Sequence, residues 1–240
     1  MEVINYLLGY RDLKIVQNTD MFSFSLDSVL LANFVSLNSG ISRVLDIGCG
    51  NAPIPLILSC KTSASITGIE IQKDVYDMAY RSVCINNLSD RINIINDDIN
   101  KYCVSCESDT FDVITCNPPF FKVSSGSKFN HSSYKVIARH EVMLNLEQLF
   151  SISRKLLKNG GVIAVVHRPD RLVDIITSMK NNNIEPKRIR FVYPKVGREC
   201  NMVLVEGAKN GRAGLKILPP LITHNEDGSY SLEVKSFFEE

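Results

Sequence analysis

No stretch of the 240-residue sequence reaches the uninterrupted apolar run of about 18 residues that a membrane-spanning helix needs. The N-terminal residues, Met1-Glu2-Val3-Ile4-Asn5, lack the basic and then apolar layout of a secretory signal peptide. Internal repeats and low-complexity linkers are also absent. These absences argue against membrane-spanning and secreted proteins, and they favour a single domain over residues 1–240 of a cytoplasmic protein.

The cysteines form no disulfide framework or metal-binding pattern. There are seven, an odd number scattered from Cys49 to Cys200 in a chain too long to need cross-links, so reduced thiols are expected. Cys103 and Cys106 have the spacing of a zinc or redox pair, but no second Cys or His pair lies at a suitable distance. The sequence therefore predicts no metal site.

A formal net charge of +1 conceals an uneven distribution of charge along the chain. Residues 151–220 contain fourteen Lys or Arg and five Asp or Glu, whereas the remainder of the chain is acidic. Such a basic segment can attract a phosphate backbone, although a solvated lysine-rich face would give the same count. Eight side chains around its last two expected strands form the predicted RNA-binding surface: Lys187, Arg188, Arg190, Lys195, Arg198, Lys209, Arg212 and Lys216.

Short apolar, β-branched runs alternate with helix-like stretches, which predicts a parallel sheet covered by helices on both faces. The expected strands are residues 43–47, 65–71, 91–96, 111–116, 161–167, 188–193 and 201–205. The expected helices are residues 28–36, 73–87, 145–157 and 171–181, with Asp27 as the N-cap of the first. Asn159-Gly160-Gly161 and Asn181-Asn182-Asn183 are expected to end helices through left-handed residues.

A glycine turn follows the first expected strand. Asp46 and Ile47 end that strand, and the turn Gly48-Cys49-Gly50 leads towards a helix. Glycine is needed here because a side chain would block the approach of a ligand to the backbone. A dinucleotide-binding turn has a third glycine where this chain has Pro53. Asp46 would repel a phosphate but suits a ligand with an ammonium group, so the pattern favours S-adenosylmethionine over NAD.

Acidic residues also end the second and third expected strands. Glu70 is placed where a carboxylate can accept hydrogen bonds from both ribose hydroxyls. Asp97 and Asp98 are placed where a carboxylate can accept from the adenine amino group. A single acidic residue at a strand end is more often part of a turn, but acidic residues at three successive strand ends indicate a ligand site.

The fourth expected strand leads into Asn117-Pro118-Pro119-Phe120, where two prolines stop the strand at the carboxyl edge of the sheet. The Asn117 side-chain oxygen and the Pro118 carbonyl can accept both hydrogens of an exocyclic amine, and Phe120 can stack on its ring. An aryl amine is a poor nucleophile because its lone pair is delocalised, and such hydrogen bonds restore the lone pair for attack on a sulfonium methyl group. Asn-Pro-Pro is also a common loop breaker, but its place at this edge favours the functional interpretation.

These motifs resemble the Asn-Pro-Pro-Tyr/Phe class of amino-methyltransferases, and more closely the bacterial family that N6-methylates adenosine 37 of tRNA-Val. The resemblance covers nearly the whole chain. Besides the glycine turn and Asn117–Phe120, it includes residues 22–31, 138–141, 167–172, 201–207 and 214–220. The last two segments are the narrower motifs and carry most of the assignment.

The resemblance implies a Rossmann-like, seven-stranded class I AdoMet-dependent methyltransferase fold, a three-layer α/β sandwich. It divides the chain into a cofactor-covering segment (1–40), a core (41–220) and a C-terminal tail (221–240), and a monomer or weak dimer is expected. The implied residues of the S-adenosylmethionine site are Phe24, Asp46, Gly48, Gly50, Glu70, Ile71, Asp97, Asp98, Ile99 and Asn117. The implied catalytic residues around the target adenine of a tRNA are Asn117, Pro118, Pro119 and Phe120.

Two positions depart from the family pattern. Ala52 stands where many relatives have a third glycine, and Phe120 stands where Tyr is frequent. Ala is small enough for backbone approach and Phe keeps a stacking face, so neither departure removes the implied activity. The Phe loses any phenolic hydrogen bond.

Further residues are candidates for substrate contacts: Phe120, Arg139, His140, Arg168, Lys195 and Arg198. Arg139 and His140 follow a polar segment, residues 122–134, that can cover the base pocket, although His140 suits a helix start equally well. Arg168 ends the fifth expected strand at the carboxyl edge and is placed to contact a phosphate.

Alternatives remain at this stage. The same chemistry serves DNA adenine, the N2 amine of rRNA guanine or a protein glutamine, since each presents an amine that the Asn-Pro-Pro carbonyls can hold. DNA enzymes of this kind usually add a target-recognition domain, for which this chain has little room. A non-catalytic AdoMet- or RNA-binding module is the alternative from another class. The intact residues Asn117–Phe120, which form the predicted amine clamp, argue against it.

Overall fold

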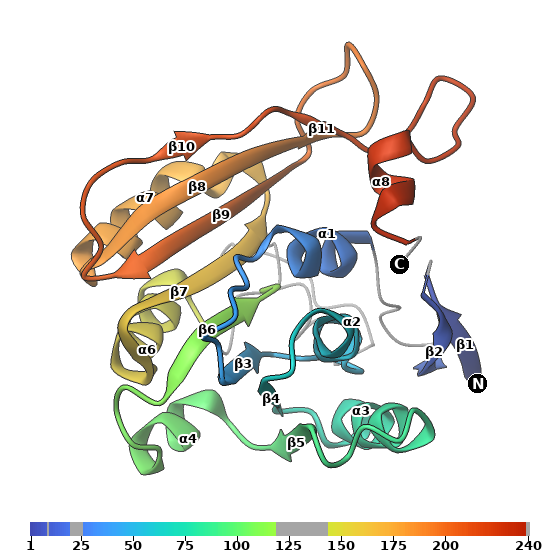
Figure 1. The fold of residues 1–240 in the computed structure, drawn as a ribbon, viewed down its shortest axis with the longest axis horizontal. Coiled ribbons are helices and arrows are strands. Elements are labelled where there is room, and N and C mark those ends of the chain that lie inside the picture. Colours follow the sequence, from blue (N-terminus) through green and yellow to red (C-terminus); the bar gives the residue numbers. More distant parts are fainter. Residues whose placement is uncertain (9, 20–25, 119–143, 239–240) are drawn as a thin grey trace, which may run out of the picture.

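The computed structural model describes residues 1–8, 10–19, 26–118 and 144–238. A nine-stranded sheet forms its centre, in the order β10-β8-β9-β7-β6-β3-β4-β5 with β11 also paired to β8 (Figure 1). The long strands are β3 (Arg43–Ile47), β4 (Ser65–Glu70), β5 (Ile92–Asn96), β6 (Phe111–Cys116), β7 (Leu157–His167), β8 (Ile184–Tyr193) and β9 (Met202–Lys209). These are the seven strands expected from the sequence. The first five in chain order pair in parallel, and β9 runs antiparallel to both β7 and β8.

Hydrophobic side chains from the sheet divide between two clusters, one on each face. Successive residues of a strand point to opposite faces, so Val44 and Val113 belong to one cluster and Leu45 and Ile114 to the other. The first cluster is covered by α1 (Leu26–Phe34), α2 (Pro53–Lys61) and α3 (Lys73–Ile85). The second is covered by α4 (Ile99–Ser105), α6 (Leu146–Leu156) and α7 (Leu172–Asn181). The predicted three-layer α/β sandwich is confirmed.

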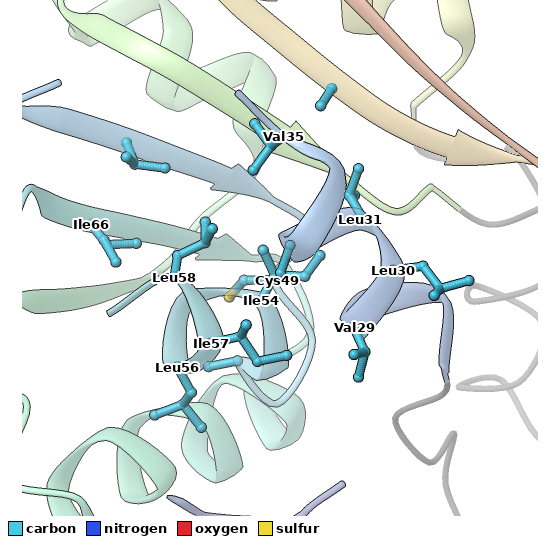
Figure 2. Packing of buried hydrophobic residues seen from close by; sticks show 14 of the residues in the cluster. Val29, Leu30, Leu31, Val35, Cys49, Ile54, Leu56, Ile57, Leu58 and Ile66 are labelled. Carbon is cyan, nitrogen blue, oxygen red and sulfur yellow. The ribbon is translucent and has the colours of Figure 1, made fainter. Parts of the chain in front are cut away.

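The helix α1 is embedded in the first cluster rather than lying loosely on it. Figure 2 shows it beside α2, with buried residues from both helices that include Leu31 and Ile54. Burial of one Leu or Ile side chain contributes about 1.5–3 kcal/mol, so a few such contacts fix a short helix firmly. This packing holds the N-terminal part of the chain against the sheet.

The sequence did not predict the N-terminal hairpin, β1 (Glu2–Leu7) and β2 (Tyr10–Asn18), which forms a separate two-stranded sheet. Side chains of α3 and of its C-cap residue Asn86 pair with the outer edge of β2: the Ser82 hydroxyl accepts from the Val16 amide at 2.9 Å, and Asn86 bonds both backbone groups of Lys14. These bonds satisfy backbone groups that would otherwise lack a strand partner.

Residues after β9 return to the sheet. The two-residue strands β10 (Lys216–Ile217) and β11 (Leu221–Ile222) extend it beside β8, and α8 (Leu232–Ser236) follows. Leu221 and Val234 are buried in the first cluster. Residues beyond 220 therefore contribute to the hydrophobic core. No helix in the described parts of the chain is long and apolar enough to span a bilayer.

Two expected helix ends are wrong. Asp27 does not cap α1, because the helix begins at Leu26 and Asp27 lies in its first turn, where a negative charge still favours the helix end. Asn159-Gly160-Gly161 ends no helix, since α6 stops at Leu156 and the next residues already pair with β6. Sheet pairing draws the chain into β7 before the glycines are reached. The left-handed Asn183 after α7 confirms the other expected stop.

Candidate functional site

Those predicted site residues that the structure describes gather at one edge of the sheet. Strands β5, β4, β3 and β6 are neighbours and mutually parallel, so their carboxyl ends meet there. In register, Ile47 lies opposite Cys116, and Glu70 lies opposite Asn96. Ligands of open α/β sheets bind at this edge, which brings the acidic residues and Asn117 to a common position.

The glycine turn has the left-handed backbone expected for a ligand cradle. Gly48 and Gly50 have φ of 67° and 57°, and apart from chain neighbours no atom of the described residues lies within 4 Å of where a Cβ would stand on either residue. The turn is held by a bond from the Cys49 amide to the Ile69 carbonyl at 3.0 Å. Ala52 takes the same left-handed conformation at φ 72°, which a non-glycine residue adopts only at some cost, directly before α2. The space beside the two glycines is open to a ligand.

Asp46 is a buried carboxyl group whose hydrogen bonding is incomplete among the described residues. It is 1% exposed; Oδ1 accepts a 2.6 Å hydrogen bond from the Thr115 hydroxyl, while Oδ2 has no hydrogen-bond partner among the described residues. Burial raises the pKa of Asp46 to about 7, a rise that the Thr115 bond opposes and the charge of Glu70 adds to. A cationic hydrogen-bond donor would relieve this cost, so the residue fits an ammonium-bearing ligand.

Glu70 joins β4 to the glycine turn. Oε2 accepts from the Gly50 amide at 3.1 Å and Oε1 from the Gln72 amide at 2.9 Å, while burial raises the pKa of the carboxyl group. The neighbouring Ile71 keeps 37% of its surface exposed, which offers an apolar face beside the carboxylate. Asn96, which was not among the predicted site residues, donates to the Glu70 and Ile71 carbonyls and holds this strand end in place. The polar side chain of Asn96 at the end of β5 is the sequence feature that could have predicted this role.

The pair Asp97-Asp98 begins α4. Asp98 is the N-cap, and its Oδ1 accepts from both the amide and the side chain of Asn100. Asp97 accepts from the Asp98 amide at 2.8 Å. In both aspartates these bonds go to the Oδ1 atom. The side chain of Ile99 is buried in the second cluster, so only its backbone is placed to meet a ligand.

Asn117 follows β6 directly and is partly buried, and Pro118 after it is buried. The Asn117 Nδ2 group donates to the hydroxyl of Ser28 on α1 at 3.4 Å. Ser28 is a second residue that sequence reasoning missed. The remaining predicted site residues lie outside the described residues: Phe24, Pro119, Phe120, Arg139 and His140, together with the polar segment 122–134.

The predicted substrate-binding cations Arg168, Lys195 and Arg198 lie at the same edge. Arg168 follows β7, and the β8–β9 turn that carries the other two emerges beside it because β9 is antiparallel, with Val203 opposite His167. Arg168 pairs with Asp170 at 3.6 Å, and Lys195 donates to the Glu226 carbonyl at 2.8 Å. Arg198 is exposed to solvent.

Other members of the predicted RNA-binding surface are placed differently, which corrects that prediction. Arg188, Arg190 and Lys209 are partly or fully buried and pair with Glu206, Glu233 and Asp109, so they serve the fold. Lys187 donates to the Arg212 carbonyl near the start of β8, at the opposite edge from Asn117. The count of basic residues in 151–220 could not show which of them are neutralised by ion pairs in the fold.

The profile of the methyltransferase small domain family matches residues 12–181, more than half of the chain. The chain belongs to the methyltransferase small domain family. That range contains the glycine turn, the three acidic strand ends and Asn117, whereas Lys195 and Arg198 lie beyond it.

Curated relatives carry the name tRNA1(Val) (adenine(37)-N6)-methyltransferase, and two of them align with most of this chain. The one from Porphyromonas gingivalis is 28% identical, covering 95% of this chain and 91% of its own length. The one from Bacteroides thetaiotaomicron is 29% identical, covering 89% and 87%. A crystal structure from Agrobacterium tumefaciens, described as a predicted O-methyltransferase, aligns with a TM-score of 0.71 at 21% identity, covering 88% of this chain and 95% of that one. This structural likeness supports the fold of the methyltransferase domain.

No group of three or more His, Cys, Asp or Glu side chains within the described ranges is arranged to hold a metal ion. All seven cysteines are free thiols. Cys103, one of the pair with zinc spacing, is buried in the second cluster on α4.

Proposed function

We propose that this methyltransferase uses S-adenosylmethionine to methylate the exocyclic N6 of an adenosine in tRNA, at position 37 of tRNA-Val. One observation carries the proposal: Asp46, a buried carboxylate whose Oδ2 has no hydrogen-bond partner among the described residues, lies on β3 beside β6, and β6 leads directly into Asn117-Pro118. A cation-binding group and an amine-binding group thus share one sheet edge. The relatives named as tRNA adenine methyltransferases support the substrate.

In this proposal the cofactor lies along the ends of β3, β4 and β5. The open backbone at Gly48 and Gly50 admits it, Asp46 receives its ammonium group, and Glu70 accepts from the ribose hydroxyls. Ile71, Asp97, Asp98, the Ile99 backbone and Phe24 would surround the adenine ring. S-adenosylmethionine supplies an electrophilic methyl group on a sulfonium centre. The residues of this chain orient that group and exclude water.

The target adenine would lie against Asn117, Pro118, Pro119 and Phe120. The Asn117 side-chain oxygen and the Pro118 carbonyl accept the two amine hydrogens, which draws the nitrogen towards tetrahedral geometry and frees its lone pair. The amine loses its proton after transfer, so no strong general base is required. Orientation in a dry pocket supplies much of the remaining rate.

The tRNA would approach the edge that carries Arg168, Lys195 and Arg198. Arg139 and His140 remain predicted contacts to the substrate. An anticodon-loop base is already accessible, so extruding it costs less than opening a duplex. Such an enzyme would act in the cytoplasm.

The deciding experiment is transfer of labelled methyl from S-adenosylmethionine to an unmodified tRNA-Val transcript, with nucleoside analysis of the product. The expected product is N6-methyladenosine, absent when adenosine 37 is replaced by guanosine. Asn117→Ala should lower the rate about 100-fold or more, as loss of a transition-state hydrogen-bond partner does. Asn93→Ala, an exposed asparagine on β5, is the matched control and should keep wild-type activity.

Other outcomes separate the alternatives. Label on DNA, rRNA or protein in place of tRNA would overturn the substrate and leave the cofactor site standing. Cofactor binding with no transfer to any of these would favour a binding module.

A further inference from the structure

The helix α1 reaches the proposed amine clamp through a serine. Ser28 lies in the first turns of α1, is 5% exposed, and accepts a hydrogen bond from Asn117 Nδ2 at 3.4 Å. An asparagine amide has a donor end and an acceptor end. With the donor end bound to Ser28, the acceptor oxygen is left for the target amine.

The C-terminal end of α1 is bound to β8 and β9 by hydrogen bonds. Glu206, on β9 and 2% exposed, accepts from the Ser36 amide at 2.6 Å and from its hydroxyl at 2.7 Å. Arg188, opposite Glu206 in register on β8, donates to the Ser36 hydroxyl and to the Phe34 carbonyl, and its guanidinium lies 4.6 Å from the centre of the Phe34 ring. These contacts, named here the α1 clamp, fix the helix along its axis and so fix the position of Ser28.

We propose that Ser28 is a positioning residue: its hydroxyl holds the Asn117 amide so that Oδ1 faces the amine that is methylated, a role that rests on the function proposed above. If the amide turned over, its NH2 group would meet the amine hydrogens, and two donors would face each other. Ser28 touches neither the substrate nor the cofactor in this role and acts through Asn117 alone.

The test is Ser28→Ala, assayed with tRNA at saturating concentrations of both substrates. Loss of one neutral hydrogen bond should lower kcat about 3- to 10-fold. The affinity for S-adenosylmethionine, measured by calorimetry, the KM for tRNA and the melting temperature should stay near wild-type values. Ser28→Thr keeps the hydroxyl and should restore most of the rate. In an Asn117→Ala background, Ser28→Ala should cause no further loss, because its effect passes through the amide.

The matched control is Ser59→Ala on α2, another buried serine, whose hydroxyl donates to the Leu56 carbonyl. It should leave kcat unchanged. The proposal is overturned if Ser28→Ala keeps the wild-type kcat, if Ser28→Thr is as slow as Ser28→Ala, or if the losses at Ser28 and Asn117 multiply. A wild-type chain that methylates no tRNA overturns the proposed function, and the role of Ser28 with it. An active wild type with an unaffected Ser28→Ala variant overturns only the role of Ser28.

Discussion

At the scale of single residues, two buried carboxyl groups lie at the sheet edge where we propose that the cofactor binds. Within the described residues the Oδ2 atom of buried Asp46 has no hydrogen-bond partner, and burial raises the pKa of both Asp46 and the neighbouring Glu70. Asp112, on the same strand as Thr115 but towards its other end, shows the opposite case. Burial opposes ionisation of Asp112, but bonds from Lys158 and from the Ser42 and Arg43 amides lower its pKa to about 2. The two aspartates differ because, among the described residues, donors satisfy both oxygens of Asp112 but only one oxygen of Asp46.

This difference predicts the pH dependence of stability. The pKa of Asp46 is about 7 in the folded chain against 3.8 ordinarily, so folding favours its protonated form, and the free energy of unfolding should fall as pH rises from about 4 to about 7. Asp46→Asn should remove this loss and stabilise the ligand-free protein at pH 8 by on the order of 1–3 kcal/mol, measured by urea unfolding. The same variant should bind S-adenosylmethionine more weakly.

Asp112→Asn is the control of opposite sign. Its pKa is depressed, so the stability it contributes is present above pH 4 and is lost as pH falls towards 2. The variant should be less stable than wild type at neutral pH. If Asp46→Asn were also destabilising at pH 8, burial of the ionised Asp46 carboxylate would not be unfavourable in the ligand-free protein, and this interpretation would be wrong.

At the scale of elements, the sequence predicted the parts whose signals are local. The seven long strands are short β-branched runs, and the carboxylates at their ends follow directly from strand position. Asn96 and Ser28 were missed because their partners are distant in sequence: the Asn96 amide reaches back to Glu70, and Ser28 meets Asn117 across 89 positions. The hairpin β1–β2 was missed because its edge is completed by side chains of α3. Pairings of this kind leave no periodic pattern in the sequence.

The α1 clamp should contribute strongly to stability because its carboxylate is buried. Glu206→Ala removes the partner of the Ser36 amide and leaves Arg188, whose side chain is 28% exposed, beside an apolar gap. We expect a loss of about 2–4 kcal/mol in the free energy of unfolding, measured by urea denaturation.

The matched comparison is Glu2→Ala, which breaks a two-bond ion pair with Arg81 between exposed side chains. Water solvates both partners there, so the loss should be far smaller. Equal losses at the two positions would show that the α1 clamp is no more than a surface ion pair.

At the scale of the whole molecule, the structure separates two groups of basic residues that look alike in the sequence. Arg198 lies in the β8–β9 turn at the edge that carries Asn117, whereas Arg212 follows β9 at the opposite edge; both are exposed. Only the first edge faces the proposed site of transfer. For each basic residue of segment 151–220, its sheet edge therefore predicts whether it binds phosphate or is only solvated.

Arg198→Ala should weaken tRNA binding and reduce its dependence on salt, because a protein that neutralises one phosphate fewer releases fewer counterions. The slope of log K against log salt should become shallower by about 0.7–0.9 for each phosphate that is no longer neutralised. Arg212→Ala, with the same loss of charge, should leave both the affinity and the slope unchanged in a filter-binding titration. Equal effects at both positions would mean that tRNA senses only net charge.

The reversed strand β9 also bears on how the chain is made. It occupies an interior place between β7 and β8 although it is translated after both. As the chain leaves the ribosome, neither β7 nor β8 can pair with β9 until residues 202–209 have been synthesised. At about 5–20 residues per second this interval is on the order of seconds, during which an apolar edge of β7 stands open. Nascent chains stalled before residue 202 should therefore be the ones that chaperones hold, and the synthesis of one strand should release them.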